Sequence, residues 1–249
     1  MKDLQAYLRA VAAVDRQLFA TGPFDVFIDP ESDQTYVNYA IPRDGAEPTR
    51  ETIEELILVM AHSGRVPRLE FLPATAPAAE EALRDFGFRE ELRTTVMTCA
   101  AEDAFVVEPP GEVQLQRLGP DAEGEVVEGF MRVIAEAFGT PHEPGGADQI
   151  APQFARRIAV LAYCDEEVAA GGMCLDPFQG VTELAGIGVH ADFRRRGIAA
   201  ALTSELARLA FADGVELAFL TPGDQATGRV YERAGFAATD EMLHLVYEG

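Results

Sequence analysis

The stretch from residue 182 to residue 214 constrains the fold more than any other part of the chain. It begins with the apolar residues of a strand, passes through an arginine-rich turn at 194–197, and continues with apolar residues at helical spacing. The sequence therefore predicts a strand, a basic loop and a helix in succession. The first N–H groups of a helix have no acceptor within it, and here three arginines stand beside them. This junction favours a bound phosphate or pyrophosphate.

Two short motifs lie in and after this stretch. The first reads Arg-x-x-Gly-x-Ala and comprises Arg194, Arg195, Arg196, Gly197, Ile198 and Ala199. The second, Tyr231-x-x-x-Gly235-Phe236, follows the next expected strand, residues 215–220. In this order the two motifs resemble those of the GNAT superfamily of N-acyltransferases, over residues 112–249.

The resemblance implies acetyl-CoA as cosubstrate and assigns it a place. Residues 194–199 would hold its pyrophosphate, and the backbone of Ile187, Gly188 and Val189 would pair with its pantetheine arm. In the family, two central parallel strands splay apart there and leave backbone groups for the cofactor. The loop departs from the family in its last position, where Ala199 replaces the more frequent glycine.

Two residues are candidates for acid–base chemistry. By resemblance, Glu183 would take a proton from the attacking amine and Tyr231 would donate one to the departing CoA thiolate. The structural alternatives are a surface carboxylate at a strand end and a buried core tyrosine. Asp224 replaces the asparagine that often precedes the last helix of the family. It can cap that helix, and by resemblance it would also contact CoA.

Composition limits the partners. The 249 residues include 42 acidic and 20 basic side chains, a net charge of −22. Such a charge repels nucleic acid and anionic membranes and attracts amines, although it is also explained by a requirement for solubility. The histidines form no ligand spacing, so no metal is expected. The sequence shows neither a leader nor a long apolar run, which predicts a cytoplasmic protein. The three cysteines are scattered along the chain, and we expect their thiols to be reduced.

The first half of the chain repeats the second in outline. Residues 68–72 align with 216–220, and Phe86-Gly87-Phe88 aligns with Ala234-Gly235-Phe236, both at a separation of 148 residues. We therefore expect a degenerate GNAT-like domain at 1–108 and a catalytic one at 109–249. The first lacks the expected site, because at this offset Tyr231 becomes Leu83 and Gly197 becomes Thr49.

Other segments are assigned by periodicity and turn residues. We expect a helix over 3–20, strands at 24–28 and 35–41, a helix over 49–64 capped by Thr49, and an acceptor-side loop at 139–146. His142 and Glu143 in this loop are candidates to bind an amine. Cys174, on an apolar strand, is expected to be buried and structural.

The sequence thus predicts an α/β protein of two GNAT-like domains. Each would have a mixed, mostly antiparallel sheet flanked by helices, with a splayed parallel strand pair in the catalytic half. The expected activity is transfer of an acetyl or other acyl group to a small-molecule or peptide primary amine. Its expected partners include a second copy of the same chain, in a homodimer. Two alternatives remain: a non-catalytic CoA sensor, and an acidic interaction protein on an inherited fold.

Overall fold

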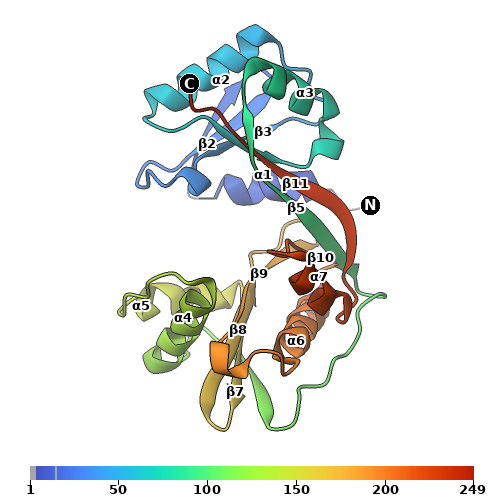
Figure 1. Ribbon diagram of the computed structural model, residues 1–249. Helices are drawn as coiled ribbons and strands as arrows, with labels where there is room; N and C mark the ends of the chain where they lie inside the picture. Colours follow the sequence, from blue (N-terminus) through green and yellow to red (C-terminus); the bar gives the residue numbers. More distant parts are fainter. Residues whose placement is uncertain (1–3, 15) are drawn as a thin grey trace. The chain divides into compact units, whose positions relative to one another are not determined.

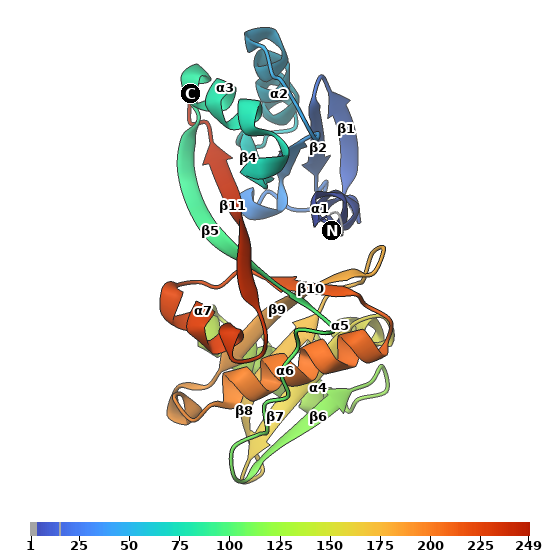
Figure 2. The same cartoon turned by 90° about the vertical axis from the view of Figure 1, so that its right-hand side faces the viewer.

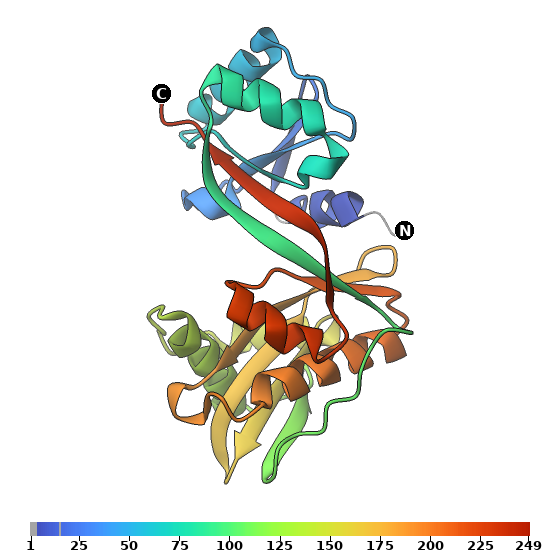
Figure 3. The ribbon, with the colours of Figure 1, turned by 45° about the vertical axis from the view of Figure 1, so that its right-hand side comes forward.

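The computed structural model describes residues 4–14 and 16–249, which form two compact units (Figure 1). Unit 1 comprises residues 4–14, 16–96 and 239–249, and unit 2 comprises residues 97–238. Both are α/β units with parallel and antiparallel strand pairs, as the sequence predicts. The divisions at 96 and 238 fall inside two long strands, β5 (Arg89–Ala100) and β11 (Ala237–Val246). Figure 3 shows both strands continuing from one unit into the other.

The sheet of unit 1 has the strand order β1-β2-β3-β4-β11-β5. Its other elements are α1 (Leu4–Ala12), β1 (Gln17–Thr21), β2 (Phe24–Ile28), β3 (Tyr39–Pro42), α2 (Arg50–His62), β4 (Arg68–Phe71) and α3 (Pro77–Phe86). Apolar residues of α2 and α3 pack on buried residues of β2, β3, β4 and β11. Thr49 caps α2, as expected: its Oγ1 accepts from the Thr52 N–H, and Thr52 Oγ1 accepts from the Thr49 N–H.

Unit 2 contains the organising stretch. Its sheet has the order β5-β10-β9-β8-β7-β6. The elements are β6 (Val113–Leu118), α4 (Gly124–Phe138), α5 (Ala147–Ile150), β7 (Ile158–Cys164), β8 (Glu167–Cys174), β9 (Val181–Val189), α6 (Ile198–Ala212), β10 (Leu217–Leu220) and α7 (Gln225–Glu232). One core lies between the sheet and α6, and another between the sheet and α4. Figure 2 shows α6 crossing the face of this sheet.

Corresponding elements of the two halves keep a constant separation. The elements α2, β4, α3 and β5 begin at residues 50, 68, 77 and 89, and α6, β10, α7 and β11 begin at 198, 217, 225 and 237. Each pair is separated by 148 or 149 residues, which agrees with the repeat in the sequence. That the chain consists of two related halves divided at residue 108 remains a proposal. The two compact units have other boundaries, because β5 begins in unit 1 and ends in unit 2, and β11 begins in unit 2 and ends in unit 1.

Two expectations for the first half require correction. The helix expected over 3–20 is wrong beyond Ala12, because residues 17–21 form β1, which pairs with β2 through a two-residue turn at Gly22-Pro23. Residues 35–37 form a 3-10 turn before the strand that begins at Tyr39. A further strand, β11, has no counterpart among the expected elements; its residues Leu243–Val246 pair antiparallel with β4.

Among the glycines of unit 2, Gly235 is the one at which an added Cβ would lie closest to other main-chain atoms. It has φ of 97°, and a Cβ built there would lie 2.2 Å from the carbonyl oxygen of Asp103. Gly214 has nearly the same φ, 91°, but a Cβ there would meet nothing within 4 Å. Substitution of the two glycines therefore separates the cost of a left-handed φ from the cost of an overlap between the new Cβ and the main chain.

We expect Gly214→Ala to lower the free energy of unfolding by about 1–2 kcal/mol, because of its left-handed φ. Gly235→Ala should lower it by about 1–3 kcal/mol more, because of the added overlap with the main chain. Urea denaturation of both variants measures the difference. Equal losses would show that the 103–104 segment moves away at no cost.

Candidate functional site

A cleft of about 1020 Å³ lies within unit 2, where β9 and β10 separate. The parallel register runs from Leu217 opposite Val181 to Phe219 opposite Glu183 and ends there. Beyond this point β9 continues to Val189 beside β8. The expected splayed pair is therefore present. The cleft volume is at the upper end of the range for small-molecule sites.

A bulge in β9 lies just after the point of separation. The β8–β9 register shifts opposite Gly186 and Ile187, and Gly186 has φ of 63°. A bulge bends its strand, and glycine adopts this φ without steric cost. On the helix side, a Cβ at Gly188 would lie 2.7 Å from the Cβ of Ala137 on α4. Gly186 and Gly188 thus let β9 bend against α4 at the wall of the cleft.

The start of α6 forms a second wall. Gly197 is the residue before the helix, has φ of 91°, and makes no side-chain cap. Arg195 also has a left-handed φ, 64°, which is uncommon for a residue other than glycine. Ile198, buried in the core, anchors the helix behind this loop. The first-turn N–H groups of α6 therefore stand at the cleft without a capping side chain.

The three arginines of this loop are exposed and contact no carboxylate within the described part of the chain. Arg194 Nε donates to the carbonyl oxygen of Val189 at 3.1 Å, and Arg196 Nη2 donates to that of Asp192 at 3.0 Å. In a chain of net charge −22, unpaired cations at a helix N-terminus form a local site for an anion.

Most of the predicted site residues line this one cleft. They are Glu183, Ile187, Gly188, Val189, Arg194, Arg195, Gly197, Ile198, Ala199, Asp224 and Tyr231. Arg196 does not line it: its guanidinium lies over the ring of Phe193, 5.1 Å from the centroid. His142 and Glu143 are also outside the cleft-lining set. His142 Nε2 instead lies 3.0 Å from Glu128 Oε2, and the same carboxylate accepts the N–H groups of Gly145 and Ala147.

Tyr231 is 7% exposed, and its ring packs in the core between the sheet and α6. Burial, with a smaller effect of the Asp224 charge, raises the pKa of Tyr231 to about 12. The hydroxyl therefore keeps its proton at neutral pH, as a proton donor must. Asp224 caps α7, because its Oδ1 accepts from the Thr227 N–H at 2.7 Å, and this bond lowers its pKa.

Sequence reasoning missed several residues of the cleft, among them Phe138, Phe193 and Arg233. Arg233 lies two residues after Tyr231 in the second motif, so its position was a usable signal. Phe138 ends α4 and is 61% exposed.

Cys174 is buried, which raises its pKa to about 12, so it is the structural thiol expected. Among the described residues no group of three potential ligands could hold a metal ion.

The folded-state pKa of Tyr231 predicts a dependence of stability on pH. This pKa lies above the value of about 10 in the unfolded chain, so the contribution of the protonated side chain to the free energy of unfolding is fully present below pH 10. As the pH rises toward 12 this contribution is lost, which lowers the free energy of unfolding by about 2–3 kcal/mol. Absorbance titration should show Tyr231 ionising near pH 12.

Tyr231→Phe should remove that late ionisation. Tyr36→Phe, at a tyrosine that is 64% exposed, is the matched control and should leave it in place. A late ionisation of the same amplitude in Tyr231→Phe as in the wild-type protein would contradict the assignment.

Residues 127–236, within unit 2, match the family model described as the acetyltransferase (GNAT) family. Among solved structures, a GCN5-related N-acetyltransferase from Kribbella flavida is 24% identical with a TM-score of 0.84, covering 100% of this chain and 97% of the other. One from Sphaerobacter thermophilus is 20% identical with a TM-score of 0.63, covering 90% and 75%.

A tandem GNAT protein from the clavulanic acid biosynthesis pathway is 13% identical with a TM-score of 0.61, covering 90% of this chain and 78% of the other. At these identities the likeness concerns the fold. No curated protein matches the chain significantly. No helix in the described ranges is both long enough and apolar enough to span a membrane.

Proposed function

The chain is a member of the GNAT superfamily, and from that premise we propose that unit 2 transfers an acetyl or other acyl group from CoA to a primary amine. One observation supports this most directly: the uncapped start of α6, with its unpaired arginines, opens onto the cleft where β9 leaves β10. The loop at 194–199 would hold the pyrophosphate, and the β9 backbone from Ile187 to Val189 would pair with the pantetheine arm.

In the proposed reaction, the amine nitrogen attacks the thioester carbonyl carbon in a ternary complex. A C–N bond forms, the C–S bond breaks, and CoA leaves as a thiolate. Glu183, where β9 and β10 separate, accepts the amine proton directly or through water. Tyr231, protonated at neutral pH, donates a proton to the thiolate. Holding both reactants in one cleft removes much of the entropic cost of their encounter.

The acceptor is proposed to be a small cationic amine. The acidic character of the chain favours attraction of cations, and Glu183 supplies a carboxylate in the cleft. The three cysteines are buried and free, which agrees with our proposal of a cytoplasmic protein that meets acetyl-CoA there.

CoA binding is tested by thermal unfolding. At about one hundred times its dissociation constant, CoA should stabilise the protein by roughly 2.7 kcal/mol, a shift of several degrees. Arg194→Glu/Gly197→Glu should lose this shift, because it adds negative charge where the pyrophosphate would lie.

Arg132→Glu/Gly214→Glu is the matched control for this experiment. It makes the same two substitutions at an exposed arginine and at a glycine with the same φ of 91°, both outside the cleft. It should retain the shift. No shift in the wild-type protein would refute the proposed cofactor.

Catalysis is tested by release of free CoA thiol from acetyl-CoA in the presence of a panel of amines. Tyr231→Phe and Glu183→Gln should each lower kcat by about 10²–10⁴-fold, because each removes one proton-transfer group. Both variants should keep the thermal shift with CoA. Binding of CoA without thiol release from any amine would favour the non-catalytic sensor.

A further inference from the structure

Helix α1 places a buried polar side chain at the open end of the parallel strand pair in unit 1. Gln5 is fully buried. Its Nε2 donates to the carbonyl oxygen of Pro42, at the end of β3, at 3.4 Å. Its Oε1 accepts from the N–H of Leu72, directly after β4, at 3.2 Å. The Gln5 amide therefore bridges two backbone groups that do not bond to each other.

This bridge occupies the position in unit 1 that corresponds to the cleft of unit 2. The strands β3 and β4 form a parallel pair, Ala40 opposite Leu69, and β3 leads into α2 as β9 leads into α6. In unit 2, β9 and β10 separate toward their carboxyl ends and a cleft opens between them. In unit 1, the Gln5 amide spans the carboxyl ends of β3 and β4 instead.

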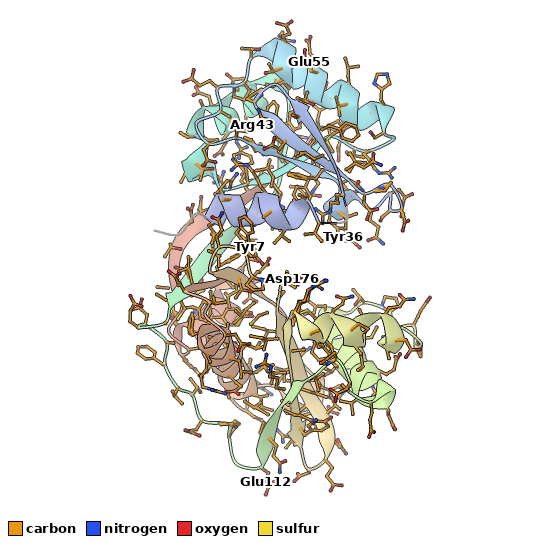
Figure 4. All side chains as sticks on the ribbon, turned by 180° about the vertical axis from the view of Figure 1, so that it is seen from behind. Tyr7, Tyr36, Arg43, Glu55, Glu112 and Asp176 are labelled. Atoms are coloured by element: carbon orange, nitrogen blue, oxygen red, sulfur yellow. The ribbon has the colours of Figure 1, made fainter. Side chains whose placement is uncertain are left out.

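Arg9, one helical turn further along α1, extends this contact toward the loop before α2. Its Nη2 donates to the Pro42 carbonyl oxygen at 3.1 Å and to Asp44 Oδ1 at 2.5 Å. Figure 4 labels Tyr7 on α1, the helix that carries Gln5 and Arg9, and Arg43, which precedes Asp44 in the sequence. In unit 1 the loop before α2 holds a carboxylate, Asp44, that is paired with Arg9 on α1. In unit 2, by contrast, the loop before α6 holds arginines without acidic partners.

The N-terminus of α2 is closed as well. Its capping box uses the Thr52 and Thr49 N–H groups internally, whereas Gly197 leaves the start of α6 without a side-chain cap. The strand opening and the helix start that border the cleft in unit 2 thus both have counterparts in unit 1 whose polar groups are satisfied from within the chain.

We infer that α1 is a built-in occupant of the cofactor position of unit 1, with Gln5 making the backbone hydrogen bonds that a pantetheine arm would otherwise make. The inference rests on the proposed function of unit 2. It follows that the chain binds one acyl-CoA, in unit 2, and that unit 1 has no second site for it.

Isothermal titration of the full chain with CoA tests the number of sites. We expect one CoA per chain in the wild-type protein and in Arg132→Glu/Gly214→Glu, and none in Arg194→Glu/Gly197→Glu. Two CoA per chain, or one remaining in the Arg194→Glu/Gly197→Glu variant, would overturn the inference. No binding to the wild-type protein would instead refute the proposed function.

Hydrogen exchange tests the bridge without any ligand. Gln5→Ala removes the acceptor of the Leu72 N–H, so exchange of that amide should accelerate at least tenfold and the thermal midpoint should fall by several degrees. Gln17→Ala, the same change at an exposed residue of β1, should alter neither. An unchanged Leu72 exchange rate in folded Gln5→Ala would overturn the role of Gln5.

Discussion

The separation of β9 from β10 beyond Glu183 and Phe219 is the constraint on which the rest of unit 2 depends. Two parallel strands that part leave backbone N–H and C=O groups without sheet partners, and such groups require an acceptor or donor from elsewhere. The bulge at Gly186 bends β9, and the small residues at its contact with α4 allow that bend. The cleft therefore results from the main chain, and side chains add charge and protons to it.

The same constraint is met in two ways in one chain. In unit 2 the opening is bordered by the uncapped start of α6 and by arginines without acidic partners, so N–H donors and positive charge are available to an anion. In unit 1 the opening is closed by the Gln5 amide, and α2 begins with a complete capping box. A buried amide with both its donor and its acceptor used stabilises the fold, whereas unsatisfied groups keep a site available.

Local signals made much of unit 2 predictable. The helical spacing after Gly197 and the turn residues around it specify a strand, a loop and a helix from adjacent residues. Eleven of the fourteen candidate site residues line the cleft, whereas Arg196, His142 and Glu143 do not. Arg196 could not be distinguished from Arg194 and Arg195, because only the backbone conformation decides which arginine lies over Phe193.

Non-local pairing explains what the sequence did not reveal. Residues 17–21 continue the helical spacing of α1, but the partner strand β2 turns them into a strand. The strand β11 has its partner β4 more than 170 residues earlier, so no local pattern announces it. The role of Gln5 depends on two backbone groups, at Pro42 and Leu72, that only the folded sheet brings to it.

The place of β11 in the sheet of unit 1 also sets an order of events during synthesis. In that sheet β11 lies between β4 and β5, and residues 243–246 follow all of unit 2 in the sequence. Domains usually fold from the N-terminus as the chain leaves the ribosome. Here the first unit lacks an interior strand until unit 2 has been made, so a nascent chain exposes the edges of β4 and β5 throughout the synthesis of unit 2.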